Sequence, residues 1–447
     1  MPSPEILHQW DFDHVWHPFT QATEWEAAGE PLIVERAEGC TLIDVHGKRY
    51  LDGISSLWTN VHGHQHPDID RAICGQVEKI SHSTMLGQAG VPSITLAKRL
   101  ADLLAQIPGD QEPLTRTFYS DSGSTAVEVA LKMAFQFQQQ IGQSKRARFA
   151  ALSEAYHGDT MGSVSVGGID LFHQIYRPLL FNAVRIPAPD HATPVEEASC
   201  LRRARQMFDE HGDEIAALVV EPLVQGAAGM RMHSIHYLQT LMKMARECGA
   251  LVICDEVAVG FGRTGTMFAM EQVGMRPDII CLAKGLSSGY LPLAATVVTN
   301  TIYDAFRAPY SDHKTLFHGH TYTGNALCCA AALANLDVFE RESVLDQLPI
   351  KIATMRRMLD ALPGQHIAEI RHKGMMAAAV LKHPLGTDAP VGHRVAMAAR
   401  RHGVIVRPLG DGIIFMPPLA ISNDEIEEIG RAVGQSILDV LAAPLGA

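Results

Sequence analysis

The chain has 447 residues, of which 47% are hydrophobic, 6% aromatic and 19% charged. This is the composition of an ordinary globular protein, and it argues against a disordered, collagen-like or coiled-coil chain. At about 100–200 residues per domain, we expect one large domain and a smaller companion. The 37 Lys plus Arg against 49 Asp plus Glu give a net charge of −12, without a basic stripe. We therefore expect neither nucleic acid nor an anionic membrane as a partner.

The sequence also bears on the compartment of the protein. No stretch reaches the ~18–20 apolar residues of a membrane span, and residues 1–20 show no basic region followed by an apolar one, so no signal peptide is expected. The eight cysteines are scattered without a CxxC pair, and several stand inside apolar runs. Cysteine in such a run usually behaves as a small core hydrophobe. We expect a reduced protein of the cytoplasm.

The first regular pattern lies at residues 31–53, which are typical of antiparallel strands with turns at Glu38-Gly39 and His46-Gly47. Further along, short continuous apolar runs alternate with amphipathic helical patterns. Strands are expected at 116–120, 147–152, 216–221, 250–255, 278–283 and 293–299, with helices at 126–140, 196–211 and 235–248. This alternation predicts an α/β fold with a mostly parallel sheet covered on both faces. In such sheets, ligands bind at the carboxyl ends of the strands.

The pattern changes after a long helix that is expected to start near Asn325. Short strands are expected within 366–381, 403–410 and 412–418, with helices at 391–402 and 423–442. This mixture predicts a compact, smaller α+β domain at the C-terminus.

Two charged residues stand at predicted strand ends. Lys284 directly follows the apolar run 278–283, where desolvation would lower the pKa of its amine and make it nucleophilic. Asp255 ends the run 250–255, and a buried carboxylate there could keep a pyridine nitrogen protonated. The structural alternatives are a lysine that reaches out to solvent and an aspartate that caps a turn. The pair, at the spacing of one strand–helix–strand unit, favours the chemical interpretation.

A candidate phosphate site lies at residues 120–125, a Ser-Asp-Ser-Gly-Ser-Thr segment between a predicted strand and a strong helix. Backbone N–H groups, hydroxyls and the helix dipole would all point at an anion there. Plain N-capping by Ser or Thr is the alternative. Tyr156, which follows the strand ending at Leu152, offers an aromatic face for a flat ring, although an aromatic in this place often serves packing alone.

Two further features have both a chemical and a structural interpretation. His62, His64 and His66 alternate in one short segment, but no Cys or carboxylate lies at a familiar zinc-ligand spacing, so we expect a hydrogen-bonded turn and no metal. Arg407 emerges from an apolar run. It could clamp a substrate carboxylate through two parallel hydrogen bonds, or it could form a buried structural ion pair.

Taken together, these motifs resemble the class III aminotransferases, which are fold-type I enzymes dependent on pyridoxal phosphate (PLP). The matching segments are 121–134, 156–160, 221–230, 255–265, 283–293 and 318–325. The resemblance runs over essentially the whole chain. It implies a large domain with a mostly parallel seven-stranded sheet. The implied domains are an N-terminal segment (1–65) that contributes to the small domain, a large PLP-binding domain (66–335) and a small α+β domain (336–447).

The resemblance implies roles toward PLP for five residues. Lys284 would anchor the cofactor and move protons as a general acid and base, and Asp255 would pair with the protonated ring nitrogen. Gly123 and Ser124 would hold the phosphate. Tyr156 would stack on the ring and border the substrate, which places it with Lys284 and Asp255 in the catalytic set.

The resemblance also implies a homodimer with shared active sites. His320 and Thr321 match positions from which this family reaches the phosphate bound by the neighbouring subunit, and Gly319 beside them would line the substrate pocket. Arg407 matches the arginine that binds the carboxylate of a keto acid. Two residues would support the site, namely Glu221 and Arg263.

Within the class, five further segments resemble one branch, namely 16–20, 51–58, 61–67, 82–87 and 407–420. This branch of biotin biosynthesis makes 7,8-diaminononanoate by aminating 8-amino-7-oxononanoate, with S-adenosylmethionine or lysine as the amino donor. Phe19, Leu57 and Trp58 are expected to contact substrate. This chain has Phe19 where some members have Tyr, Leu57-Trp58 where they have a Trp pair, and Ile414 where they have Tyr. A broad ω-aminotransferase, acting from β-alanine or a diamine to pyruvate, is the alternative.

Overall fold

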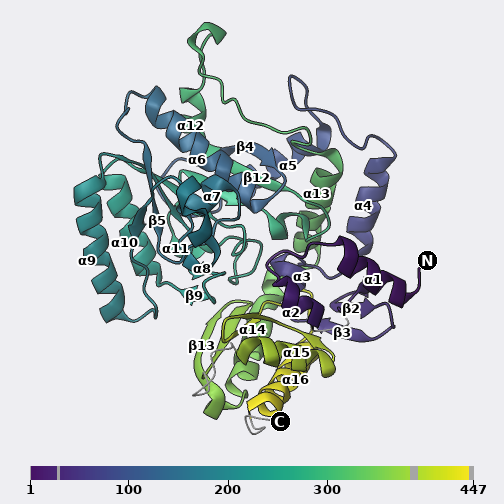
Figure 1. Cartoon of the computed structure of the whole chain (residues 1–447). Helices are drawn as coiled ribbons and strands as arrows, with labels where there is room; N and C mark the ends of the chain where they lie inside the picture. The colour runs from purple at the N-terminus through teal and green to yellow at the C-terminus, as the bar shows by residue number, and fades with distance from the viewer. Residues whose placement is uncertain (1, 28–30, 383–390, 442–447) are drawn as a thin grey trace.

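The computed structural model describes residues 2–27, 31–382 and 391–441. In Figure 1 the large sheet and its helices occupy the upper part, and the C-terminal elements lie below, with the purple N-terminal segment beside them. The elements that precede the large sheet are α1 (Pro4–His14), α2 (Ala22–Ala27), β1 (Val34–Glu38), β2 (Thr41–Asp44), β3 (Arg49–Asp52), α3 (Ser55–Trp58), α4 (Pro67–Val77) and α5 (Val91–Leu104).

The large sheet has seven strands in the order β4-β12-β11-β10-β7-β5-β6. Strand β12 is antiparallel to both of its neighbours, and the other pairs are parallel. The strands are β4 (Leu114–Ser120), β5 (Arg148–Leu152), β6 (Val184–Ile186), β7 (Ile215–Val220), β10 (Leu251–Asp255), β11 (Ile279–Leu282) and β12 (Ala294–Thr299). This confirms the predicted α/β fold with a mostly parallel seven-stranded sheet.

The central strands are buried on both faces, which is why they are continuous apolar runs. In β7 all six residues are buried, and successive side chains pack into different cores: Leu218 and Val220 into one, Val219 into the other. Helices α6 (Gly123–Gln140), α7 (Met161–Val166) and α12 (Asn300–Ala305) contact the strands from one side. Helices α5, α9 (Pro194–His211) and α10 (Ile235–Glu247) also contact strands of the sheet, and residues of these three helices lie in the first core.

Short elements connect these layers. They are α8 (Asp170–His173), β8 (Val224–Gln225), β9 (Arg231–Met232), α11 (Ala269–Val273) and the 3-10 turns Gln174–Leu179, Lys284–Ser287, Tyr310–Asp312 and Gly364–His366.

The smaller domain is built on an antiparallel sheet in the order β13-β14-β17-β16. Its elements, with the helix that leads into it, are α13 (Ala326–Arg341), α14 (Val344–Asp360), β13 (Ile367–Lys373), β14 (Met376–Leu381), α15 (Val391–Arg401), β15 (Val404–Ile405), β16 (Arg407–Leu409), β17 (Gly412–Phe415) and α16 (Asn423–Leu441). Residue 442, the last of the helix expected at 423–442, lies outside the described residues.

A second four-stranded sheet combines strands from the N-terminal and C-terminal parts of the chain. Strands β1, β2 and β3 form the predicted antiparallel meander, and β15 adds to β3 in parallel, with Val404 opposite Leu51. The run 403–410 therefore supplies strands to two different sheets, β15 to this one and β16 to the sheet of the small domain. The exact domain limits stay a prediction; helix α13 runs through residue 335 without a break.

Among the described residues, none of the helices combines the length and the apolar character needed to cross a bilayer.

Candidate active site

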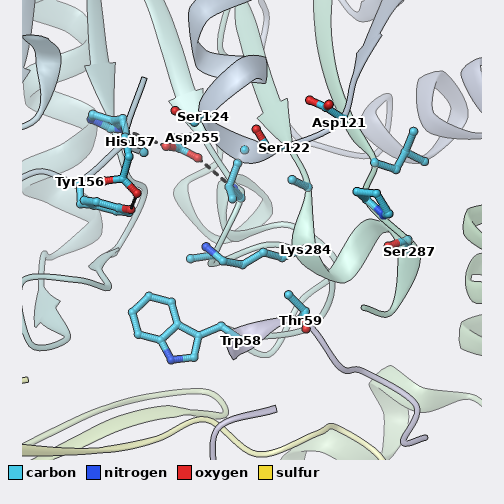
Figure 2. A pocket seen from close by; sticks show the side chains of 18 of the residues that line it. Trp58, Thr59, Asp121, Ser122, Ser124, Tyr156, His157, Asp255, Lys284 and Ser287 are labelled. Carbon is cyan, nitrogen blue, oxygen red and sulfur yellow. Dashed lines mark hydrogen bonds and ion pairs between the residues drawn. The ribbon is translucent and has the colours of Figure 1, made fainter. Parts of the chain in front are cut away.

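A cavity of about 610 Å³ opens at the carboxyl ends of β10 and β11, beside the first turn of α6. The residues singled out in the sequence that line it include Trp58, Gly123, Ser124, Tyr156, Glu221, Asp255 and Lys284. In Figure 2, Lys284 lies between Trp58 below it and Asp255, Ser122 and Ser124 above it. The fold thus gathers residues from six separate segments at one sheet edge, as expected for an open α/β sheet.

Asp255, the last residue of β10, is 5% exposed. Its Oδ1 accepts the backbone N–H of Val257 at 3.0 Å, and its Oδ2 lies 2.8 Å from Nδ1 of His157. The His157 side chain is fully buried, and its Nε2 has no hydrogen-bond partner in the described structure. A buried carboxylate fixed by two partners at the cavity wall suits a protonated ring nitrogen.

Lys284 begins the 3-10 turn that follows β11, and its backbone is in the left-handed region at φ 46°. Non-glycine residues rarely adopt this conformation, and such strain concentrates at functional sites. Burial lowers the pKa of the Lys284 amine, while the nearby carboxylates of Asp255 and Glu221 act to raise it. Its Nζ lies 5.4 Å from the centroid of the Trp58 ring. The amine is thus held in the cavity and is easier to deprotonate than a surface lysine.

The first turn of α6 forms the opposite wall. Ser122 caps the helix: its Oγ accepts the N–H of Thr125 at 3.3 Å, and Thr125 Oγ1 accepts the N–H of Ser122 at 3.0 Å. At Gly123 an added Cβ would lie 2.5 Å from a methyl carbon of Val257, so no larger residue fits. The Ser124 Oγ accepts the N–H of Thr160 at 3.0 Å. The N–H groups at this helix start have no partner within the helix, and they make a site for an anion such as phosphate.

Tyr156 is fixed at both ends. Its N–H donates to Oε1 of Glu221 at 3.1 Å, and its hydroxyl donates to Oδ2 of Asp159 at 2.7 Å. Burial raises the pKa of the Tyr156 hydroxyl, and the bond to Asp159 adds to this. Glu221 is buried and also accepts the N–H of Gly226 at 3.0 Å; burial raises the pKa of its carboxyl to about 7. Glu221 therefore fixes the backbone of Tyr156.

Arg407 and Phe19 line a second cavity of about 560 Å³. The two cavities share Ala227 in their walls, so they adjoin. Within the described part of the chain, the half-buried guanidinium of Arg407 makes no hydrogen bond or ion pair. Among the described residues, the structural ion pair considered for Arg407 is therefore not formed, which leaves its guanidinium available to an anionic group.

Residues 24–437 match the family model of the class III aminotransferases. The chain belongs to this family. The adenosylmethionine-8-amino-7-oxononanoate aminotransferase of Nitratidesulfovibrio vulgaris is 52% identical, over 97% of this chain and 82% of that protein.

Solved structures of aminotransferases have the same fold as this chain. The enzyme of the same name from Methanocaldococcus jannaschii superposes with a TM-score of 0.90 and 40% identity, over 98% of this chain and 99% of that one. A PLP-bound amine transaminase from an uncultivated Pseudomonas species superposes with a TM-score of 0.88 and 34% identity, over 96% of this chain and 99% of that one. The family and the aminotransferase activity predicted from the sequence are confirmed.

Four of the predicted residues lie outside both cavities of this aminotransferase chain: Leu57, Gly319, His320 and Thr321. Leu57 is 49% exposed. The carbonyl of Thr321 accepts a hydrogen bond from Nε2 of His82 at 2.7 Å, on the surface. One chain alone does not bring the last three to Lys284, so their roles stay predictions.

Two other groups of residues also lie outside the cavities. His62 Nε2 bonds to the carbonyl of Asn335 and His66 Nε2 to Glu342, both at 3.1 Å. In the described chain, no group of three or more His, Cys, Asp or Glu could hold a metal ion. Arg263 is 1% exposed and donates to the carbonyls of Pro417 and Asn60 at 2.6 and 2.7 Å, so it joins three segments of the chain.

Proposed function

We propose that this class III aminotransferase transfers an amino group from S-adenosylmethionine to the ketone of 8-amino-7-oxononanoate, giving 7,8-diaminononanoate for biotin synthesis. The observation that carries the proposal is the pair of adjoining cavities, with the amine of Lys284 in one and the guanidinium of Arg407 in the other. An acceptor with a ketone near one end and a carboxylate at the other matches this arrangement. The names of its relatives, at up to 52% identity over nearly the full chain, point to the same reaction. A broad ω-aminotransferase is not favoured.

The residues of the first cavity fit PLP, the cofactor that the family implies. PLP supplies an electron sink that stabilises the carbanion formed when an amine carbon loses its proton. Asp255 would hold the ring nitrogen protonated, and the first turn of α6, with Gly123 and Ser124, would hold the phosphate. Tyr156 would cover the ring. The buried Asp255–His157 pair and the absence of room for a side chain at Gly123 support this fit.

Lys284 would do the proton transfer. Its desolvated amine, with a lowered pKa, has a larger neutral fraction at pH 7 than an ordinary lysine and so can accept a proton from the substrate carbon. Once protonated, it can return that proton to a neighbouring atom. Trp58 beside it, 7% exposed, helps to exclude water from the transfer.

We further propose a homodimer in which Gly319, His320 and Thr321 complete the site of the neighbouring subunit. These residues lie on the surface segment after Tyr310–Asp312, where Phe317 and Tyr322 are 68% and 63% exposed. Large exposed apolar side chains of this kind mark interaction surfaces. A monomer by light scattering at micromolar concentration would contradict this. The eight free cysteines support a reducing compartment, and we propose the cytoplasm.

The two half-reactions test the function. Purified enzyme loaded with PLP is mixed separately with S-adenosylmethionine, lysine and β-alanine, and absorbance follows conversion of the cofactor to its amine form. We expect S-adenosylmethionine to convert it and 8-amino-7-oxononanoate to reverse the change. Conversion by lysine in place of S-adenosylmethionine would keep the acceptor and correct the donor. Conversion by β-alanine, with no response to the oxononanoate, would establish the ω-aminotransferase instead.

Arg407→Ala is expected to raise KM for 8-amino-7-oxononanoate about 10- to 100-fold. A hydrogen-bonded charge contributes ~1.5–3 kcal/mol, and Arg407 binds a group that takes no part in the chemistry, so kcat should change less. Steady-state kinetics with the acceptor varied measures both. Arg407→Lys keeps the positive charge but loses the planar guanidinium, so its KM should lie between that of the native enzyme and that of Arg407→Ala. A loss confined to the donor half-reaction would refute this role.

A further inference from the structure

Phe172, on α8, contacts two aromatic rings that belong to the two different cavities. Its ring centroid lies 5.4 Å from that of Phe19, at an interplanar angle of 74°, and 6.2 Å from that of Tyr156, at 82°. Both are edge-to-face arrangements, which aromatic rings prefer. Phe172 therefore bridges a residue of the cofactor cavity and a residue of the adjoining one.

The position of these rings relates them to the proposed substrate. Phe19 and Phe172 line the second cavity together with Arg407, while Tyr156 and Lys284 line the first. Ala227 lies in both walls. The aromatic side chains thus stand along the route between the amine of Lys284 and the guanidinium of Arg407.

The backbone of Phe19 is an independent sign that its position matters. Its φ is 53°, in the left-handed region that bulky side chains rarely adopt, and its side chain is 58% exposed. Strain and exposure of an apolar ring both cost free energy, and an observed outlier of this kind is a reason to look for function. In this conformation the ring contacts that of Phe172.

We propose that Phe172, seated against Phe19, is a specificity-determining residue: the two rings form an apolar wall that selects acceptors by the length of the chain between ketone and carboxylate. This proposal rests on the proposed function, because it concerns the same site and acceptor. Between its ketone and its carboxylate, 8-amino-7-oxononanoate carries only methylene groups. These would lie on the wall while Arg407 holds the carboxylate and Lys284 faces the ketone.

The wall explains why a short or polar amine would gain little here. One methylene more or less in an apolar pocket changes selectivity by about 10- to 200-fold. On this proposal, we expect a homologue that is one methylene shorter to lose either the contact with the wall or one of its two ends at Lys284 and Arg407. We expect β-alanine and pyruvate, which lack such a methylene chain, to gain nothing from the wall.

The test measures selectivity and binding. We compare kcat/KM for 8-amino-7-oxononanoate with that for the homologue shorter by one methylene. We expect a ratio of at least about tenfold in the native enzyme, falling below about threefold in Phe172→Ala and to an intermediate value in Phe172→Leu. In parallel, calorimetry with hexanoate, octanoate and decanoate should show affinity rising with length in the PLP-loaded enzyme, and a flatter rise in Phe172→Ala.

Phe135→Ala is the matched control, since Phe135 is 41% exposed on α6 and lines neither cavity. In this variant the kcat/KM ratio and the rise of carboxylate affinity with chain length should both stay native. An unchanged length preference in Phe172→Ala would overturn the proposal, as would a preference lost in Phe19→Ala but kept in both Phe172 variants. If Phe172→Ala does not fold, Phe172→Leu decides by the same criteria. Length-dependent carboxylate binding that depends on Phe172, without amination of the oxononanoate, would support the wall and overturn the proposed function.

Discussion

Replacing Lys284 with alanine is expected to lower the rate of both half-reactions by at least about a thousandfold, the scale of a lost general acid–base or nucleophilic group. Among the described residues that line the cavity, the two carboxylates that act on the pKa of Lys284 already have hydrogen-bond partners. Asp255 is bound to His157 and to the N–H of Val257, and Glu221 accepts two backbone N–H groups. Stopped-flow absorbance after mixing with each substrate measures the two rates.

Two comparisons separate chemistry from folding. Lys284→Arg keeps the positive charge, but a guanidinium does not release its proton at neutral pH, so this variant should be as slow as Lys284→Ala. The melting temperature of the cofactor-free protein should not fall in Lys284→Ala, because the buried amine carries a desolvation cost. Transfer retained within about tenfold of native in Lys284→Ala would refute the proton-transfer role.

The large sheet could be predicted because its strands carry their signal locally. Strands β7, β10, β11 and β12 are runs of apolar residues whose limits the structure moves by one residue at most. The split of 403–410 could not be predicted. Val404 and Ile405 pair with β3, some 350 positions earlier, and no local pattern records a partner so distant. The two-residue strands β8 and β9 are too short to show a period.

Some residues of the candidate site could likewise be predicted from the sequence, and others could not. Lys284 and Asp255 follow strong strand signals, so their meeting at one sheet edge could be inferred. His157 was missed as the partner of Asp255, since the two lie 98 positions apart and a histidine after a tyrosine carries no signal of its own. Phe172 was missed because one aromatic in a short helix is usually packing; only the ring contacts show its place between the cavities.

Asp255→Asn is expected to lower kcat by about a hundred- to a thousandfold, the scale on which removal of one preorganised electrostatic partner slows an enzyme. The substitution keeps the shape of the side chain and its ability to accept the N–H of Val257, so the melting temperature should change little. What it removes is the negative charge that would keep the ring nitrogen of PLP protonated. Steady-state kcat and thermal unfolding of the same preparation measure the two effects.

The neighbouring carboxylate provides the matched control. Glu256 is fully buried and accepts the N–H groups of Ala269 and Met270 at 2.9 and 2.8 Å, but it does not line the cavity. Burial raises the pKa of Glu256 to about 8. Because its carboxyl does not reach the cavity, Glu256→Gln should keep native kcat. A PLP analogue methylated on the ring nitrogen carries a permanent positive charge and should restore part of the activity of Asp255→Asn. Failure of that rescue, in a variant that binds the analogue, would mean that Asp255 acts by some means other than holding the ring nitrogen charged.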